Sequence, residues 1–243
     1  MSWLRHSDSP NTRRRQSDPA TTSIDTPPTP SPPTSPTTPP RLRRTERDRG
    51  RPRHGGRVVE VRVVRLLWAG AEAFKQQLVA VTEPQWGWPT PCEGWTVHDL
   101  VKHVVAGNEM AIGLLGGRPA RSLAGSSGTD RGLAAAFAET CVGQAEAFTA
   151  AAPEVLVAHP AEQITAAEFA IYRCADIVVH AWDLGRAIGA DDAIAPELVD
   201  QVVAPYVDWV QTLDVAGVFA AAPPGVCGES RQDQLLRQLG RTP

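Results

Sequence analysis

Asp176 and His180 stand four residues apart within a largely apolar run that predicts a helix. Residues at this spacing lie about 40° apart around an α-helix and one turn apart along it, so a carboxylate and an imidazole can converge on one cation. Zinc and similar divalent ions prefer imidazole nitrogen and carboxylate oxygen, and a catalytic site keeps one coordination position open. A third protein ligand must come from elsewhere, and our candidate is His103. The residues therefore predict a divalent metal site, with zinc as the first choice, at His103, Asp176 and His180.

Two interpretations of this stretch stay open at the level of sequence. His180 could instead be a core histidine with an ordinary hydrogen-bond partner, beside an acid on the helix surface. Asp183 shares the helical face of Asp176 and His180, and a carboxylate there can accept the second ring N–H of a metal-bound imidazole. The alternative for Asp183 is a surface ion pair with Arg186.

The other histidines are not expected to join the site. His98 points about 140° away from His103 on the same predicted helix. His159 falls in a predicted loop, where we expect an exposed side chain. The proposed ligand set therefore remains at three residues.

The chain shows no motif of a nucleophilic or nucleotide-dependent enzyme. The run Gly125–Gly128 is not a GxSxG elbow, and there is no P-loop or GxGxxG sequence. The four cysteines show no CxxC spacing, which argues against a zinc ribbon or a thioredoxin motif. Cys92 and Cys174 lie near the predicted ligands in sequence, but buried cysteines usually serve only in packing. Any chemistry would depend on a metal or on a thiol supplied by another molecule.

Apolar residues at helical spacing predict an all-α protein with few strand signals. Capping-box patterns open two of the helices, at Thr96–Asp99 and Thr165–Glu168, and Gly189 is suited to end the second of these. Connections of the predicted lengths favour antiparallel neighbours. We expect a four-helix bundle with C-terminal helical additions, built from helices near residues 61–81, 96–115, 133–148, 165–188, 196–213 and 230–239.

Residues 1–57 differ in composition from residues 58–243, which we take as the folded domain. They carry 12 Arg and five acidic residues and a long Pro, Thr and Ser tract, so they are predicted to form a disordered arm. The remaining 12 basic and 22 acidic residues give the domain a formal charge of −10. Such an acidic body disfavours nucleic-acid binding. No apolar run of membrane-spanning length and no signal-peptide pattern occurs, and we expect a cytoplasmic protein without a membrane partner.

Three segments carry a family resemblance: Pro89–His103 (PTPCEGWTVHDLVKH), Asp176–Gly189 (DIVVHAWDLGRAIG) and Leu235–Arg241 (LLRQLGR). Together they resemble actinobacterial metal-binding proteins of the DinB-like, mycothiol-dependent maleylpyruvate isomerase superfamily. The resemblance implies a DinB-like four-helix bundle whose ion, usually zinc, is held by His103, Asp176 and His180. In the isomerase itself Glu stands in place of Asp176, and we expect this chain to lack that enzyme's additional C-terminal domain.

The resemblance also suggests a function. We expect a metal-dependent transferase or isomerase in which the ion activates the thiol of a small cosubstrate of the mycothiol type toward an electrophile. The alternative is a metal-binding or stress-response module of the same superfamily without catalytic activity.

Overall fold

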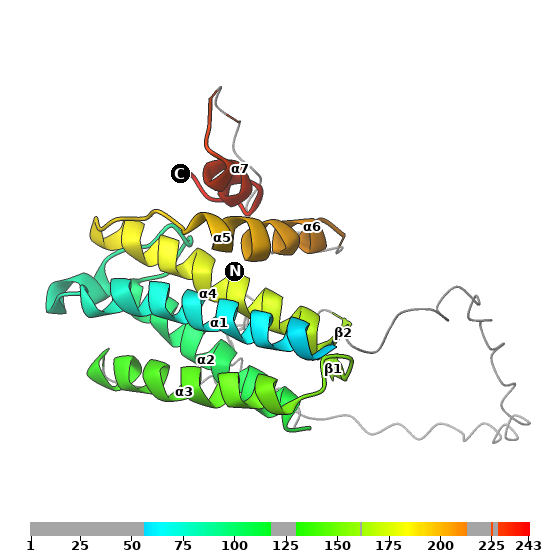
Figure 1. Ribbon diagram of the computed structural model, residues 1–243. Coiled ribbons are helices and arrows are strands. Elements are labelled where there is room, and N and C mark those ends of the chain that lie inside the picture. Colours follow the sequence, from blue (N-terminus) through cyan, green and yellow to red (C-terminus); the bar gives the residue numbers. More distant parts are fainter. Residues whose placement is uncertain (1–55, 118–129, 161, 213–224, 226–227) are drawn as a thin grey trace, which may run out of the picture. The chain divides into compact units, whose positions relative to one another are not determined.

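The computed structural model describes residues 56–117, 130–160, 162–212, 225 and 228–243. Four long helices pack together as a bundle (Figure 1), which confirms the expected all-α class and the expected four-helix bundle. The predicted arm, residues 1–57, lies outside the described part apart from the first two residues of α1, so it stays a prediction. The four helices are α1 (Gly56–Val79), α2 (Val97–Leu115), α3 (Asp130–Ala150) and α4 (Ala166–Ile188).

The ends of the two helices that carry the predicted ligands follow from their local sequence. Thr96 accepts a hydrogen bond from the Asp99 amide and so caps α2, while the Asp99 carboxylate bonds back to Thr96. Thr165 and Glu168 form the same reciprocal box at the start of α4. Gly189 ends α4 with a φ of 71°, a conformation that glycine adopts without strain. Both predicted capping boxes and the predicted stop are confirmed.

The order of directions in the bundle differs from the expected antiparallel succession. Asn108 of α2 contacts Thr140 of α3, and Ile112 lies close to Gly143, so residue numbers rise together along the two helices and α2 runs parallel to α3. The chain between them spans about 14 residues and can reach about 45 Å, more than the length of about 28 Å of α2. A connection of that length can return to the starting end of the bundle, so the antiparallel expectation was wrong for this pair.

A short hairpin and a 3-10 turn were not expected. Strands β1 (Leu156–Ala158) and β2 (Gln163–Thr165) pair antiparallel, with Val157 opposite Ile164. Both of these side chains are buried, and β2 leads directly into the cap of α4. Strands of three residues are too short to show an alternating pattern in the sequence. The 3-10 helix η1 (Glu83–Gly87) follows α1.

The C-terminal additions pack against α4 and against one another. The predicted fifth helix is present as a continuous helical stretch, although its second part, η2 (Val199–Val203), is π-helical. The π-helical part η2 lies between α5 (Pro196–Leu198) and α6 (Ala204–Thr212). The last element of the described chain is α7 (Arg231–Gln238). Leu213, which we placed in the fifth helix, lies outside the described residues. None of the helices in the described ranges combines the length and apolar content needed to cross a membrane.

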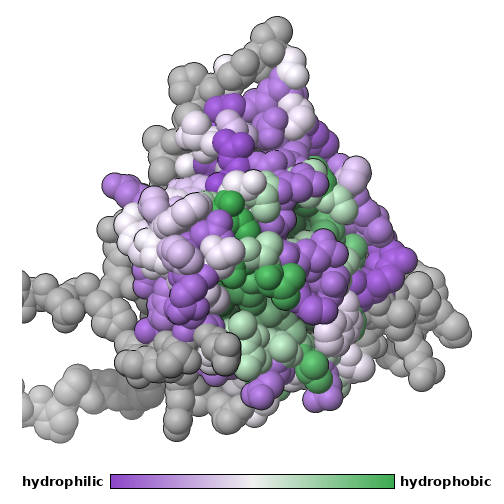
Figure 2. Space-filling model, turned by 90° about the vertical axis from the view of Figure 1, so that its left-hand side faces the viewer, coloured by the Kyte–Doolittle hydropathy of each residue, from purple (hydrophilic) through white to green (hydrophobic). Residues whose placement is uncertain are grey.

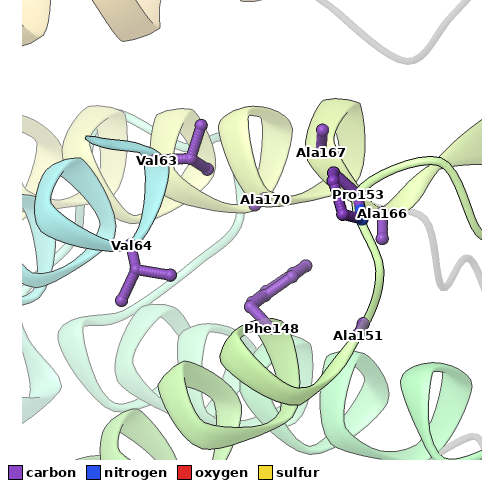
Figure 3. Close-up of a pocket in the computed structure, with 8 residues that line it drawn as sticks. All are labelled: Val63, Val64, Phe148, Ala151, Pro153, Ala166, Ala167 and Ala170. Atoms are coloured by element: carbon purple, nitrogen blue, oxygen red, sulfur yellow. The ribbon is translucent and has the colours of Figure 1, made fainter. Parts of the chain in front are cut away.

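The surface has two apolar features. Figure 2 shows one face of the molecule, with hydrophobic residues gathered in its middle and hydrophilic residues around them. A small hollow lies where α1, α3 and the start of α4 meet (Figure 3), and every residue that lines it is apolar. Its lining residues are Val63, Val64, Phe148, Ala151, Pro153, Ala166, Ala167 and Ala170.

Phe74 provides a test of the core. Its ring is fully buried in α1 and packs on Phe137 of α3, with the ring centroids 4.8 Å apart. Phe74→Ala should lower the free energy of unfolding by about 3–5 kcal/mol, because it leaves a cavity at the contact between two helices. Val79→Ala, at a side chain that is 76% exposed, should change it by less than about 0.5 kcal/mol. Urea denaturation measures both, and equal effects would contradict the assigned core.

Candidate metal centre

The three residues predicted as ligands lie together between α2 and α4. The Nε2 atom of His103 is 3.4 Å from Oδ1 of Asp176, and Nε2 of His180 is 3.5 Å from the same oxygen. One ligand atom from each residue lies within 4.8 Å of the other two. Ligands at bond lengths of about 2.0–2.2 Å in a tetrahedral site are about 3.3–3.6 Å apart. The two separations from Asp176 therefore match the edges of such a site.

The burial of these side chains also suits a cation. His180 is fully buried, whereas His103 and Asp176 keep 17% and 14% of their side-chain surface exposed, so the group is reached from solvent on one side. The buried Nε2 of His180 makes no hydrogen bond. A buried polar atom without a partner is unfavourable and uncommon in folded proteins. Two imidazole nitrogens and a carboxylate oxygen around this atom form a donor set that fits zinc or a similar ion.

Asp183 and Arg241 orient His180 through its Nδ1 atom, on the side of the ring away from Asp176. The Nδ1 atom of His180 donates to Oδ2 of Asp183 at 2.9 Å, and this leaves the lone pair of a neutral imidazole on Nε2. Arg241 donates to both oxygens of Asp183, at 2.7 and 3.2 Å. Arg186 pairs with Asp192 instead, so the alternative of a surface pair between Asp183 and Arg186 was wrong. Of the two interpretations that the sequence left open for Asp183, the structure shows the hydrogen bond to His180, and the spacing of the residues gave no sign that Arg241 lies beside it.

A second arginine holds Asp176. The guanidinium of Arg173 donates to Oδ2 of Asp176, and its other terminal nitrogen donates to the Val104 carbonyl at 2.9 Å and to Oδ1 of Asn108 at 2.8 Å. A Cβ at Gly107 would lie 2.6 Å from the guanidinium carbon, so the glycine provides the space for this group. We did not single out Arg173 in the sequence, although an arginine inside an apolar helical run, three residues before a predicted ligand, was a usable signal.

The loop before α2 forms one wall of the site. It folds back on itself between Trp88 and Val97, with Gly94 at a φ of 77°. This turn places the Trp95 ring 4.9 Å from the His103 ring and 6.0 Å from the His180 ring, measured between centroids. The loop thus covers the two imidazoles with an aromatic side chain.

Cys92 from the same loop belongs to a second group of possible ligands, with His180 and Asp183. Its sulfur lies 3.3 Å from Oδ2 of Asp183 and 3.9 Å from Nδ1 of His180. In this group Nδ1 of His180 and Oδ2 of Asp183 are already hydrogen-bonded to each other, and the same oxygen accepts from Arg241, whereas Arg173 takes Oδ2 of Asp176 and leaves Oδ1 facing the two Nε2 atoms. The group around Asp176 is therefore the better candidate for a metal.

The electrostatics of the site separate the two histidines. Burial opposes charge on His180, but the negative charge of Asp176 and the hydrogen bond that the ring donates to Asp183 raise its pKa well above the usual value. Burial dominates at His103 and lowers its pKa despite the nearby Asp176. Burial would raise the pKa of Asp176, yet Arg173 and the two histidines hold it well below its usual range. In the absence of a metal, Asp176 is therefore a carboxylate facing one histidine that favours protonation.

The remaining histidines and cysteines lie apart from this group. His98 pairs with Asp130 at 2.6 Å, which confirms that it does not share the site. His159 is half-buried, with its ring against those of Phe169 and Trp209, so the expectation of an exposed side chain was wrong. The contacts come from α4 and α6, which no local pattern in the loop could indicate. Burial raises the pKa of Cys174 to about 12, in agreement with its expected packing role.

Fold and site together define a helical-bundle protein with two imidazoles and one carboxylate gathered between two helices. The profile of the family described as mycothiol maleylpyruvate isomerase N-terminal domain matches residues 67–185, which include all three of these residues. Two uncharacterized proteins of Mycobacterium tuberculosis, from strains CDC 1551 / Oshkosh and ATCC 25618 / H37Rv, are each 35% identical over 176 residues. That alignment covers 70% of this chain and 93% of each relative.

The chain belongs to this family of mycothiol maleylpyruvate isomerase N-terminal domains, as the resemblance in its sequence indicated. Among solved structures, it is similar to the crystal structure of a histidine-to-alanine mutant of the mycothiol-dependent maleylpyruvate isomerase. That match has a TM-score of 0.49 and 20% sequence identity, and it covers 61% of this chain and 66% of the other.

The buried ion pair behind His180 can be compared with an exposed one. Arg241→Gln leaves the Asp183 carboxylate buried without its counter-ion and should lower the free energy of unfolding by about 3–5 kcal/mol. Arg231→Gln removes an arginine from an exposed pair with Asp200 and should cost less than about 1 kcal/mol. Urea denaturation of both variants checks this, and a small effect of Arg241→Gln would show that the pair is not buried in solution.

Proposed function

We propose that this protein is a metal-dependent enzyme whose divalent ion, with zinc as the first choice, is held by His103, Asp176 and His180. The observation that carries the proposal is the fully buried Nε2 of His180, which makes no hydrogen bond and lies 3.5 Å from Oδ1 of Asp176, with a ring nitrogen of His103 within 4.8 Å of the other two ligand atoms. Three protein ligands leave a position for an exogenous group, as in catalytic zinc sites. The partial exposure of His103 and Asp176 supports access for a small molecule.

The substrate side of the proposal rests on the family. Its description names mycothiol, and we infer that the exogenous group is the thiol of a small cosubstrate of this type, transferred to or acting on an electrophile. A divalent ion would supply the positive charge that favours the ionised, nucleophilic form of a thiol at neutral pH. The reaction class is thiol transfer or thiol-assisted isomerisation.

The side chains of this protein would prepare the site for that chemistry. The Asp183 carboxylate fixes the His180 ring through Nδ1, so that Nε2 points to the centre without rearrangement. Arg173 fixes the Asp176 carboxylate, and the Trp95 ring limits the access of water to the two imidazoles. Such an arrangement lowers the cost of reorganisation when a charged group enters.

Metal analysis tests the ligand set. The wild-type protein, loaded with zinc and dialysed, should hold about one ion per chain, and His103→Ala or His180→Ala should abolish stoichiometric binding because each removes one of three ligands. His98→Ala is the matched control, since this histidine lies on the same helix as His103 but pairs with Asp130. Inductively coupled plasma mass spectrometry gives the counts. Full metal content in both ligand variants would refute the assignment.

A thiol assay separates an enzyme from a binding module. Metal-loaded protein mixed with mycothiol and a panel of small electrophiles should consume the thiol faster than the metal-free form, because the ion favours its nucleophilic state. The His98→Ala variant should keep the wild-type rate, whereas His180→Ala should fall to the metal-free rate. Stoichiometric metal without any acceleration, across the whole panel, would favour the non-catalytic metal-binding module.

A further inference from the structure

Each carboxylate of the site has its own buried arginine. Asp176 is paired with Arg173, and Asp183 is paired with Arg241, and both arginine side chains are about 95% buried. Arg173 acts on Asp176 and His103, and Asp183 acts on His180, besides the charges of the three predicted ligands on one another. Burial raises the pKa of the nearby Tyr206, whose phenol therefore stays neutral. The described side chains around the ligand atoms thus sum to no net negative charge when both histidines are neutral.

The position of Arg173 is fixed by two helices. Asp176 lies one turn along α4 from it, and the Val104 carbonyl and the Asn108 amide oxygen on α2 receive its other terminal nitrogen. Gly107 leaves the space that the guanidinium occupies, because a Cβ there would lie 2.6 to 2.9 Å from its atoms. These contacts hold the guanidinium at one place between α2 and α4.

This contact divides the two oxygens of Asp176 between two tasks. Oδ2 accepts the hydrogen bond from Arg173, while Oδ1 faces the Nε2 atoms of His103 and His180. One oxygen is available to a cation, and the charge of the carboxylate is already offset by the guanidinium. The protein would therefore supply no net negative charge to balance a divalent ion at this position. Because the surroundings are buried, solvent would screen the charge of the ion poorly.

We propose that Arg173 is a positioning residue which restricts Asp176 to a single coordinating oxygen and offsets its charge, so that the open position of the metal centre selects an anion. This inference rests on the proposed function, and it names the class of group that enters the site: a thiolate or another small anion in preference to a neutral ligand.

The test uses the full chain loaded with Co²⁺ and titrated with thiocyanate, followed by the visible spectrum of the ion. Arg173→Gln should weaken thiocyanate binding by at least about tenfold, because it removes a positive charge close to the ion in a buried site. Co²⁺ binding itself should be retained or strengthened. The control is Arg186→Gln, which removes an arginine from the same helix at an exposed pair with Asp192 and should bind thiocyanate like the wild type.

The spectrum gives a readout that a purely structural role would not change. Freeing Oδ2 should let Asp176 bind with both oxygens, so the intense bands of four-coordinate Co²⁺ should weaken in Arg173→Gln. Arg173→Lys keeps the charge but cannot bond Asp176 and α2 together, so it should retain more of the anion affinity than Arg173→Gln. A folded Arg173→Gln protein with wild-type thiocyanate affinity, or one that no longer binds Co²⁺, would overturn the inference.

A pair of glycine variants covers the case in which Arg173→Gln does not fold. Gly107→Ala places a methyl group against the guanidinium and should displace it from Asp176, whereas a Cβ at Gly113 of the same helix meets nothing within 4 Å. Gly107→Ala should bind thiocyanate more weakly than Gly113→Ala, and equal affinities would overturn the inference. If the wild-type protein takes up no Co²⁺, both the proposed function and this inference fail. If it binds Co²⁺, the comparison of the thiocyanate affinities of the two glycine variants tests this inference alone.

Discussion

The orientation of His180 is the constraint on which the rest of the site depends. A buried imidazole usually has hydrogen bonds at both ring nitrogens, and here only Nδ1 makes one, to the Asp183 carboxylate. Nε2 is left facing Asp176 and His103. Because Asp183 is itself held by Arg241, the last residues of the chain determine how a side chain in the middle of α4 points. The C-terminal additions are therefore part of the site and are more than a cover on the bundle.

The bundle brings this arrangement about through the crossing of α2 and α4. Both helices are anchored at their starts by capping boxes, and α4 is buried along most of its length. Arg173 spans the gap between them and ties Asp176 to the backbone of α2. Two buried arginines, one for each carboxylate, keep the interior close to neutral, and their attraction to the carboxylates offsets part of the desolvation cost of the buried charges.

The secondary structure was largely predictable, because amphipathic periods, Thr caps and a terminal glycine are local signals. The parallel course of α2 and α3 was not predictable. The amphipathic pattern of a helix does not show whether it runs parallel or antiparallel to its neighbour, and the connection between these two helices is long enough for either arrangement. The β1–β2 hairpin escaped notice because three residues show no period. The half-buried position of His159 likewise depends on Phe169 and Trp209, which approach from helices elsewhere in the chain.

The sequence by itself determined the helices and the pairing of Asp176 with His180, because a spacing of four residues fixes two side chains on one face of a helix. It also marked His103, and through a family resemblance it supplied the expected chemistry. Only the tertiary structure decided that His103 reaches the same point, that Arg186 turns away from Asp183, and that Arg173 and Arg241 each take a carboxylate. These contacts join residues that are distant in the chain or that have several partners within reach, and which partner is chosen follows from how the helices pack.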